Sequence, residues 1–486
     1  MSTTNTFRLL AAVAVFTCNS TLAAQDQVES RPLQESPKPN LLILIADDLG
    51  VDYVSAYGEG PDPAKTPNID ALADRGVLFR NAWASPVCSP TRACIHTGRY
   101  SFRTGIGAVL RGGNGGRRGR RGGGRGRRPG TGGAVAGLPL SELTLPELLD
   151  KAGSGYSHAA IGKWHLGAGE ESRGPNQAGW SHFAGSLSGS LRGENAYFNW
   201  QRTVNGATEV CRTYATTMNV DDTLDWIEET EQAEKPWLCY LSFNAPHAPF
   251  HNPPNDLHEI DASSLAARRA TVPQYRAMVE AMDREIGRLL RGLGEARDRT
   301  NVIFMGDNGT PGQVAQTPFL SNHAKGSLYE GGVNVPLIVA GPIVKTEGRE
   351  TSALVSATDI FSTAAELCGV SVQGNVPRDL QIDGLSFVPI LSNAKHPTIR
   401  STVFSESFRG SNPAQNGRAA IRGPRYKVVR EYRAGSTTDE FYDLESDPFE
   451  QTKLLWGDLN GEQQAEITAL CAEMDRLRSS ARDTPR

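Results

Sequence analysis

Residues 40–48 read NLLILIADD, a continuous apolar run that ends at two adjacent aspartates. A run of this kind, without alternation of polar and apolar residues, is typical of a strand covered on both faces in a parallel sheet. The pattern recurs at residues 237–243, before NAPH, and at residues 301–305, before GDNG, and residues 336–340 predict a further strand. These runs predict a central sheet with polar residues at the carboxyl ends of its strands, where such sheets place their active sites.

Helices are predicted between these strands, most clearly from Tyr275 to Leu293. Apolar residues there follow helical spacing and form one stripe, which comprises Tyr275, Met278, Val279, Met282, Ile286, Leu289, Leu290 and Leu293. Because strands alternate with helices along the chain, we expect an α/β domain with a mostly parallel central sheet flanked by helices.

Length and composition leave room for a second domain. The chain has 486 residues, 38% hydrophobic and 21% charged, which excludes a disordered chain and a small disulfide scaffold. The composition shifts after Leu391. Short strands are predicted at residues 402–405, 419–422 and 426–430, followed by a final helix over residues 467–477. We expect a large domain over residues 40–395 and a smaller C-terminal α+β domain with an antiparallel sheet over residues 396–486.

The N-terminus is typical of an export signal. Arg8 provides a positive charge, residues 9–16 form a short apolar stretch, and residues 21–24 supply a small-residue cleavage site. We expect a signal peptide over residues 1–24, a linker over residues 25–39, and a mature protein that is periplasmic or secreted. No later segment reaches the roughly 20 apolar residues that a membrane-spanning helix needs.

The formal net charge of -4 hides an uneven distribution, because residues 111–133 contain eight arginines and no acidic residue. This Gly/Arg-rich tract cannot bury a core, and we interpret it as a mobile insertion. The alternative is that it captures a polyanion such as a sulfated polysaccharide. An acidic remainder with one basic tract argues against a dedicated nucleic-acid-binding protein, and no nucleic-acid partner is expected.

The seven cysteines are widely scattered, and Cys18 lies in the predicted signal peptide. One disulfide among the others is possible, and neither a C-x-x-C nor an H-E-x-x-H motif indicates a zinc site. Cys239 and Cys368 lie in apolar runs and are predicted to be buried packing residues.

Four oxygen-bearing side chains follow two of the predicted strands: Asp47, Asp48, Asp307 and Asn308. Carboxylates gathered at one edge of a sheet repel one another unless a cation offsets their charge. Hard oxygen ligands favour Ca²⁺ or Mg²⁺ over zinc. The alternative is that the first pair caps a helix and the second pair forms a turn.

Residues 88–92 read CSPTR and are followed by TGR at residues 97–99. This segment resembles the sulfatase family, whose hallmark is C-x-P-x-R followed shortly by T-G-R. Further matches, in family order from Asn40 to about Leu455, are GKWHLG at residues 162–167, APHAPF at 245–250, DNG at 307–309, KG at 325–326, YEGG at 329–332, YDL at 442–444 and DP at 447–448. The resemblance implies an alkaline-phosphatase-like fold for the large domain and a family-type C-terminal domain.

The resemblance also implies that Cys88 is oxidised to formylglycine by a maturation enzyme. The hydrated aldehyde offers two hydroxyls, one to attack sulfur and one to help expel sulfate, so that one difficult displacement becomes two easier steps. The alternative is a small buried cysteine in a loop. The ion expected beside it is Ca²⁺, with Mg²⁺ second, held by Asp47, Asp48, Asp307, Asn308 and the oxidised Cys88.

The resemblance assigns further roles around this residue. Arg92 would orient the formylglycine and offset its charge, Lys163 would contact it and the sulfate, and His165 would take a proton when the hemiacetal collapses. Because Lys163 and His165 are two apart in a segment that we expect to be extended, both side chains should face the same side. His247 and Lys325 match positions that bind sulfate and protonate the departing alcohol oxygen. Such a set around one oxyanion would stabilise a sulfuryl transition state.

Two more histidines lie near these motifs. His96, between C-x-P-x-R and T-G-R, is predicted to pack, and His251 is a candidate for lining the substrate pocket. The residues together predict a sulfuric ester hydrolase that acts on a sulfated carbohydrate or an aryl sulfate. Two alternatives stay open: a phosphomonoester or phosphodiester hydrolase of the same superfamily, and a non-catalytic polyanion-binding protein that uses the arginine-rich tract.

Overall fold

The computed structural model describes residues 38–110, 137–167, 171–193, 195–266, 271–410, 416–433 and 435–480. The predicted signal peptide, nearly all of the linker and the Gly/Arg-rich tract lie outside the described residues. Lys38–Arg486 forms one compact unit, and the domain boundary after residue 395 stays a prediction.

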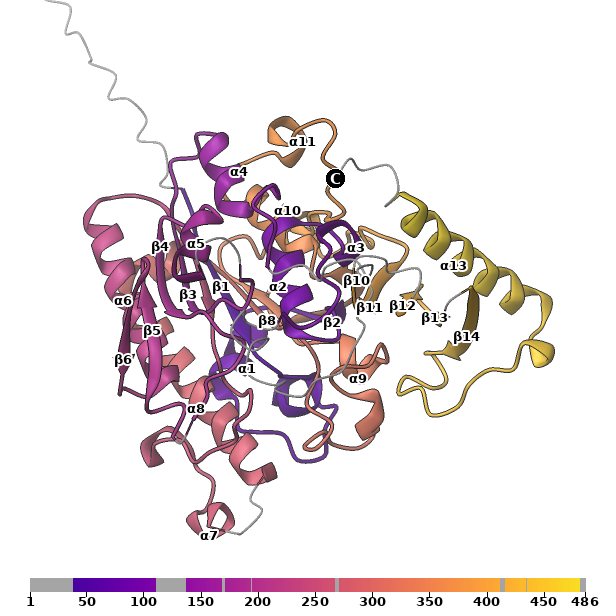
Figure 1. Cartoon of the computed structure of the whole chain (residues 1–486), viewed down its shortest axis with the longest axis horizontal. Helices are drawn as coiled ribbons and strands as arrows, with labels where there is room; N and C mark the ends of the chain where they lie inside the picture. The colour runs from indigo at the N-terminus through magenta and orange to yellow at the C-terminus, as the bar shows by residue number, and fades with distance from the viewer. Residues whose placement is uncertain are drawn as a thin grey trace, which may run out of the picture. The chain divides into compact units, whose positions relative to one another are not determined.

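A large mixed sheet forms the centre of the molecule (Figure 1). Its strands are β1 (Asn40–Ala46), β2 (Gly76–Trp83), β3 (Ser157–Lys163), β4 (His182–Ser186), β5 (Trp200–Val204), β6 (Ala207–Cys211), β7 (Trp237–Ser242), β8 (Thr300–Gly306), β9 (Leu337–Ala340) and β10 (Arg349–Ser356). They lie in the order β10-β2-β9-β8-β1-β7-β3-β4-β5-β6. β1 is parallel to β7 and β8, and β3 is parallel to β7 and β4. The prediction of a mostly parallel sheet is confirmed, although β9 runs antiparallel to β8 and β2, and β5 runs antiparallel to β4 and β6.

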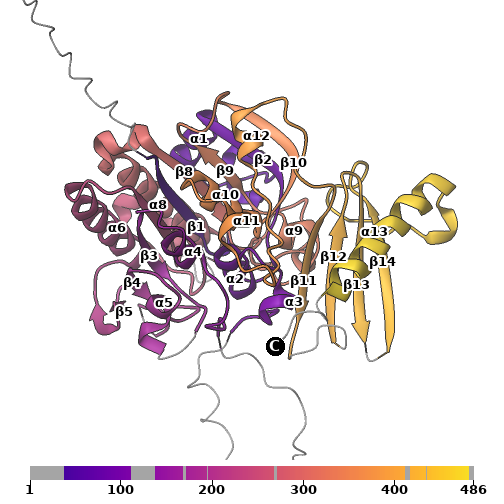
Figure 2. The ribbon, with the colours of Figure 1, turned by 90° about the horizontal axis from the view of Figure 1, so that it is seen from above.

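Helices cover both faces of this sheet (Figures 1 and 2). One face packs against α1 (Pro67–Asp74), α6 (Ala215–Gln232) and α8 (Thr271–Gly292), and the other packs against α2 (Cys88–Thr97), α4 (Leu145–Lys151) and α10 (Asp359–Leu367). The shorter helices are α3 (Ser101–Thr104), α5 (Gly174–Gln177), α7 (Ala262–Leu265), α9 (Glu330–Val333), α11 (Val372–Asn375) and α12 (Val388–Ser392). Helix α8 begins four residues before the predicted start at Tyr275.

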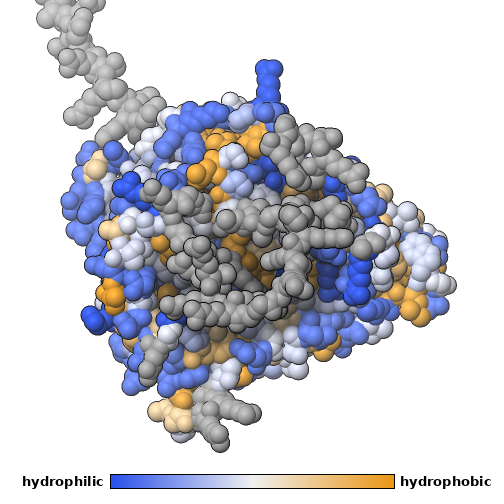
Figure 3. Space-filling view, in the orientation of Figure 1, coloured by the Kyte–Doolittle hydropathy of each residue, from blue (hydrophilic) through white to orange (hydrophobic). Residues whose placement is uncertain are grey.

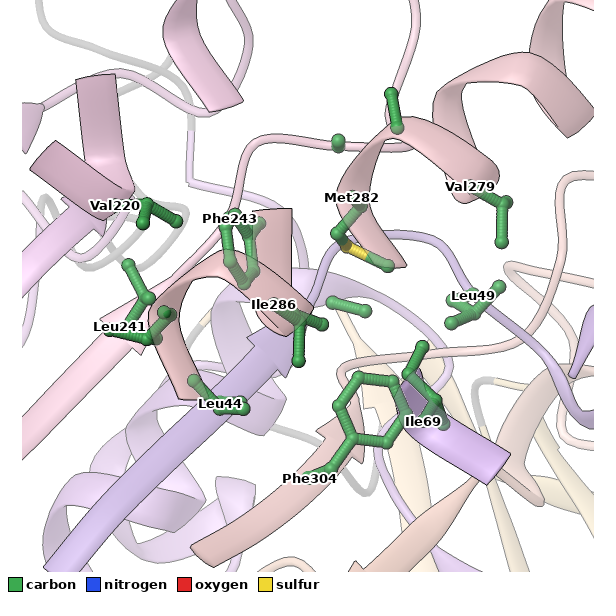
Figure 4. Packing of buried hydrophobic residues seen from close by; sticks show 14 of the residues in the cluster. Leu44, Leu49, Ile69, Val220, Leu241, Phe243, Val279, Met282, Ile286 and Phe304 are labelled. Atoms are coloured by element: carbon green, nitrogen blue, oxygen red, sulfur yellow. The ribbon is translucent and has the colours of Figure 1, made fainter. Parts of the chain in front are cut away.

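Alternate residues of β1 point to opposite faces, which explains why the whole strand is apolar. Leu44 packs in one cluster with Met282 and Ile286 of α8, as Figure 4 shows. Ile43 packs in the other cluster with Phe361 of α10. Because every β1 side chain is buried on one side or the other, β1 lies in the middle of the sheet, and the residues that follow it begin the site described below.

A separate antiparallel sheet follows in the C-terminal part, as predicted. It consists of β11 (Val403–Phe408), β12 (Asn416–Arg422), β13 (Tyr426–Arg433) and β14 (Ser436–Asp443), paired in that order. Helix α13 (Gly461–Ser479) lies along this sheet in Figure 2 and buries Ile467, Leu470 and Met474 against it. The sequence did not predict β14, because its first residues are polar and exposed.

Hydrophilic residues dominate the rim of the face seen in Figure 3. Within the described ranges, no helix combines the length and the apolar character that crossing a bilayer requires.

Candidate active site

The carboxyl edge of the large sheet carries four of the five predicted metal ligands. Asp47 and Asp48 follow β1, and Asp307 and Asn308 follow β8, its parallel neighbour. The N–H of Asp307 donates to Ala46 O over 2.9 Å, and the N–H of Asp48 donates to Asp307 Oδ1 over 3.1 Å. Parallel strands end at the same edge of a sheet, so the pairing of β1 with β8 brings both pairs together.

Cys88 is the first residue of α2 and is 2% exposed. Its Sγ and one carboxylate oxygen each from Asp47 and Asp307 lie within 4.8 Å of one another. One ligand atom each from Asp47, Asp48 and His247 also lie within 4.8 Å of one another and form a second group. Residue 88 therefore faces the carboxylates from the start of a helix.

Arg92 is fully buried one turn further along α2. Its Nη2 lies 2.8 Å from Asp307 Oδ2, and its Nη1 donates to Lys163 O over 2.9 Å and to Ser242 Oγ. Sequence reasoning missed Ser242, although its place as the last residue of β7 is a usable signal. The guanidinium thus links the ends of β3 and β7 to the residue that follows β8.

Lys163 and His165 both reach the site, but the predicted reason was wrong. Lys163 is the last residue of β3, and its Nζ forms an ion pair with Asp47 Oδ2. His165 is not extended, because its φ of 56° is left-handed. This turn carries the imidazole back toward α2, where Nδ1 lies 3.2 Å from Cys88 Sγ.

His247 and Lys325 line the more open side of the site. Lys325 Nζ forms an ion pair with Asp48 Oδ1, and His247 Nε2 lies 3.8 Å from Asp48 Oδ2. Their side chains are 19% and 20% exposed respectively, whereas those of Lys163 and Arg92 are fully buried. A ligand entering the site would meet these two side chains before the buried ones.

Burial dominates the ionisation of the site. It raises the pKa of Asp47, which Lys163 only partly offsets, and it raises the pKa of Asp307 to about 6. Burial also acts to raise the pKa of Asp48, but Lys325 and His247 hold it below its ordinary value. Carboxylates that are this costly to ionise are stabilised by a bound cation.

The thiol and the imidazoles are neutral at physiological pH. Burial raises the pKa of Cys88 to about 11, so the thiol is a poor nucleophile as it stands. Burial lowers the pKa of His165 well below its ordinary value, helped by Lys163 and Arg92, and lowers that of His247 to about 4. Neutral imidazoles at these positions can accept a proton.

The donor set fits a hard divalent cation. Asp47 Oδ1 and Asn308 Oδ1 are buried and have no hydrogen-bond partner among the residues that the structure describes. Carboxylate and amide oxygens of this kind are the ligands that Ca²⁺ and Mg²⁺ prefer. The structure therefore leaves two hard oxygen donors available at the point where the sequence predicts an ion.

Three residues that sequence reasoning missed tie the loop after β1 to the loop after β8. Gly50 N donates to Thr310 Oγ1 over 3.0 Å, and Thr310 Oγ1 donates to Asp52 Oδ1 over 2.5 Å. A Cβ at Gly50 would lie 2.7 Å from both side-chain oxygens, so only glycine fits there. The spacing of Asp52 after the aspartate pair carries no signal without the fold.

The two other histidines near the sulfatase motifs, His96 and His251, have structural positions. His96 is buried against Trp164, Trp180 and Tyr240, as its predicted packing role requires. His251 packs against Tyr197 with the two rings tilted and their centroids 4.1 Å apart, and its ring nitrogens contact Pro249 O and Tyr214 Oη. With both nitrogens engaged, His251 braces the loop behind His247, and its pocket-lining role stays a prediction.

The cysteines within the described ranges are all free: Cys88, Cys94, Cys211, Cys239, Cys368 and Cys471. The disulfide that the sequence allowed does not form among them. Cys239 and Cys368 are buried in the core, as predicted.

Comparison with known families identifies the chain. A family model described as Sulfatase matches residues 39–370. The chain belongs to the sulfatase family. A second model, described as N-sulphoglucosamine sulphohydrolase, C-terminal, matches residues 321–479, which include the antiparallel sheet.

Curated sulfatases are similar over most of this chain. Human (Homo sapiens) N-acetylgalactosamine-6-sulfatase is 30% identical over 378 residues, which cover 73% of this chain and 66% of the relative. Mouse (Mus musculus) arylsulfatase J is 27% identical over 430 residues, which cover 83% of this chain and 66% of the relative. The chain thus spans just under two thirds of the length of these relatives.

Solved structures share the fold. The structure of Ps i-CgsB in complex with k-i-k-neocarrahexaose is 25% identical, with a TM-score of 0.73, and the match covers 92% of this chain and 94% of that one. The PsFucS1 sulfatase from Pseudoalteromonas sp. is 22% identical, with a TM-score of 0.72, over 92% and 91% of the two chains. The predicted sulfatase resemblance and alkaline-phosphatase-like fold are confirmed.

Proposed function

We propose that this member of the sulfatase family hydrolyses a sulfate ester to an alcohol and inorganic sulfate, using a formylglycine made from Cys88 and a bound Ca²⁺. The position of Cys88 carries the proposal. Its Sγ lies in one group with oxygens of Asp47 and Asp307 and 3.2 Å from His165 Nδ1. A neutral thiol in this position needs conversion by a maturation enzyme before it can attack sulfur.

Asp47, Asp48, Asp307 and Asn308 would hold the cation, together with residue 88. When present, the cation would polarise the sulfate oxygens and the formylglycine would supply the attacking hydroxyl. The two unpartnered oxygens on Asp47 and Asn308 support this assignment within the described part of the chain.

The remaining site residues would handle charge and protons. His165 Nδ1 faces residue 88 and would accept a proton from its side chain. Lys163 and Lys325 would offset the charge on the sulfate. His247 Nδ1 lies 2.6 Å from Ala248 O and so carries a proton there, which leaves Nε2 facing the site. Bound sulfate would favour the protonated imidazole, so His247 or Lys325 would then protonate the departing alcohol oxygen.

We propose a sulfated carbohydrate as the substrate class, with aryl sulfates as a simpler alternative. Two findings support this choice: the curated relatives include N-acetylgalactosamine-6-sulfatases, and the similar structure of Ps i-CgsB holds a neocarrahexaose. The predicted export of the chain agrees with a substrate outside the cytoplasm.

A comparison of aryl sulfate and aryl phosphate turnover by purified, matured protein tests the reaction class. Sulfate turnover should dominate, and dominant phosphate cleavage would establish the phosphoester hydrolase instead. Peptide mass spectrometry on the same sample should find residue 88 as the aldehyde. A non-catalytic polyanion-binding protein would instead keep its function in Cys88→Ala and lose it on deletion of residues 111–133.

A further inference from the structure

Ser89, directly after the candidate nucleophile, links two segments that meet at His165. It is fully buried as the second residue of α2. Leu110 N donates to Ser89 Oγ over 3.1 Å, and Ser89 Oγ donates to His165 O over 3.1 Å. The hydroxyl thus accepts one bond and donates one, and each has a single chemically permitted direction, because an N–H only donates and a carbonyl only accepts.

The His165 ring connects Leu110 to residue 88. Its Nε2 lies 3.0 Å from Leu110 O, and its Nδ1 lies 3.2 Å from Cys88 Sγ. Since a carbonyl oxygen can only accept, Nε2 must carry the proton of the neutral imidazole, and the Nδ1 lone pair points at residue 88. Leu110 is therefore bonded to Ser89 through its N–H and to His165 through its carbonyl.

The surroundings leave His165 little freedom. A Cβ at Gly189 would lie 2.1 Å from His165 Nε2, so any side chain there would displace the ring. His165 N donates to Leu187 O over 3.3 Å, and the residue keeps a left-handed φ of 56°. A non-glycine residue in that conformation persists only when neighbouring contacts hold it.

We propose that Ser89 is a positioning residue that holds His165 as the Nε2-protonated tautomer, with Nδ1 directed at residue 88. This inference rests on the proposed function, since it names what prepares the proton acceptor of that reaction. Without the hydroxyl, the Leu110 N–H and the His165 carbonyl lose their shared partner, and the Leu110 carbonyl is free to move away from the ring. A misplaced acceptor slows proton transfer without weakening substrate binding.

The test uses Ser89→Ala, with Ser89→Thr as the variant that keeps a hydroxyl. Turnover of an aryl sulfate is measured per molecule of converted residue 88, which mass spectrometry counts, so that a maturation defect is not mistaken for a positioning defect. We expect Ser89→Ala to lower kcat about 10-fold at nearly unchanged KM. Ser89→Thr should restore most of the rate. A matched control is Ser405→Ala, another buried serine that donates to a carbonyl, Ala84 O over 3.0 Å, and it should leave kcat unchanged.

A double-mutant cycle separates positioning from general stability. In a His165→Ala background, Ser89→Ala should change kcat by less than about 2-fold, because both substitutions remove the same prepared acceptor. If the double mutant lost kcat by the product of the two single losses, or if Ser89→Ala left kcat unchanged, the inference would be overturned and the proposed function would stand. A wild-type protein that is inactive although its residue 88 is fully converted to formylglycine would overturn the proposed function itself.

Nitrogen NMR of His165 reads the tautomer directly, without any variant. The shifts should report a protonated Nε2 and an unprotonated Nδ1. The opposite tautomer would reject the inference even if Ser89→Ala failed to fold.

Discussion

The candidate active site and the cluster of Glu330, Arg422, Lys427 and Glu450 both bury charged side chains, but they differ in how their oxygens are paired. In this second group, which we term the closed cluster, Lys427 Nζ lies 3.0 Å from Glu330 Oε1 and 2.8 Å from Glu450 Oε1. Arg422 Nη1 lies 3.0 Å from Glu330 Oε2, and Glu330 N donates to Glu450 Oε2. Each carboxylate oxygen of the closed cluster therefore lies against a charged group or an N–H, although Glu450 Oε1 has only the ion-pair contact with Lys427 and no hydrogen bond within the described ranges.

The candidate active site differs in that its unpartnered oxygens lie at the position of the predicted metal ligands. Asp47 Oδ1 and Asn308 Oδ1 are buried without a partner within the described ranges. Buried polar atoms are normally paired, and unpaired oxygens beside several carboxylates can serve as ligands for a cation. The difference teaches that burial of charge alone does not mark a functional site. The closed cluster joins β12 and β13 to α9, whereas the candidate active site leaves oxygen ligands for an ion.

Removal of the candidate nucleophile should have the largest effect. Cys88→Ala should lower sulfatase turnover on the order of 10⁴-fold or more, because no other group can replace a nucleophile. Cys94→Ala, at a buried free cysteine of the same helix, is the matched control and should keep the activity. Kinetics with an aryl sulfate checks both variants, and an active Cys88→Ala enzyme would remove the basis of the proposed mechanism.

Removal of divalent cations should affect the candidate active site and leave the closed cluster unchanged. Chelation should lower turnover about 100-fold or more, since the cation stabilises charge on the sulfate. Ca²⁺ at about 100 times its Kd should stabilise the fold by about 2.7 kcal/mol, and this gain should vanish in Asp307→Asn. Thermal unfolding with and without Ca²⁺ or Mg²⁺ measures it, and a Tm indifferent to both ions would argue against the metal site.

Breaking the closed cluster should affect stability rather than chemistry. Lys427→Met leaves buried Glu450 without its cation and leaves Glu330 with Arg422 alone, which should cost about 3–5 kcal/mol in the free energy of unfolding. Lys453→Met removes an ion pair to Glu440 from a side chain that is 57% exposed, so it should cost only about 0–1 kcal/mol. Urea unfolding compares the two variants, and equal losses would mean that the closed cluster is not a stabilising feature.

The smallest expected effect is on the pH dependence of the closed cluster. Burial raises the pKa of Glu450 from 4.5 to about 7, despite the pull of Lys427. The folded protein then binds this proton more tightly than the unfolded chain, so its contribution to stability is full below about pH 4.5 and is lost as the pH rises to about 7. The pKa of Glu330 is lowered, so Glu330 titrates below this window.

Glu450→Gln should remove this dependence. Between pH 5 and pH 8, the wild type should lose about 1–3 kcal/mol of unfolding free energy that the variant keeps. Urea unfolding at both pH values provides the measurement. Parallel pH profiles of variant and wild type would show that Glu450 does not titrate in this range.

Much of the central fold could be predicted from local patterns. Continuous apolar runs located β1, β7 and β8, and helical spacing located α8 to within a few residues. β14 was missed because its side chains are largely exposed, so no apolar pattern marks it. The antiparallel direction of β9 was missed because a four-residue apolar run carries no information on direction.

By itself, the sequence determined which residue types are present and the order in which the sulfatase motifs occur. It located Asp47 and Asp307 at the ends of predicted strands. Only the tertiary structure decided that the ends of β1 and β8 are neighbours, that His165 turns back through a left-handed residue, and that Ser89 and Leu110 meet at its ring. The physical reason is that strand order and loop conformation depend on contacts between residues far apart in the chain, which no local spacing encodes.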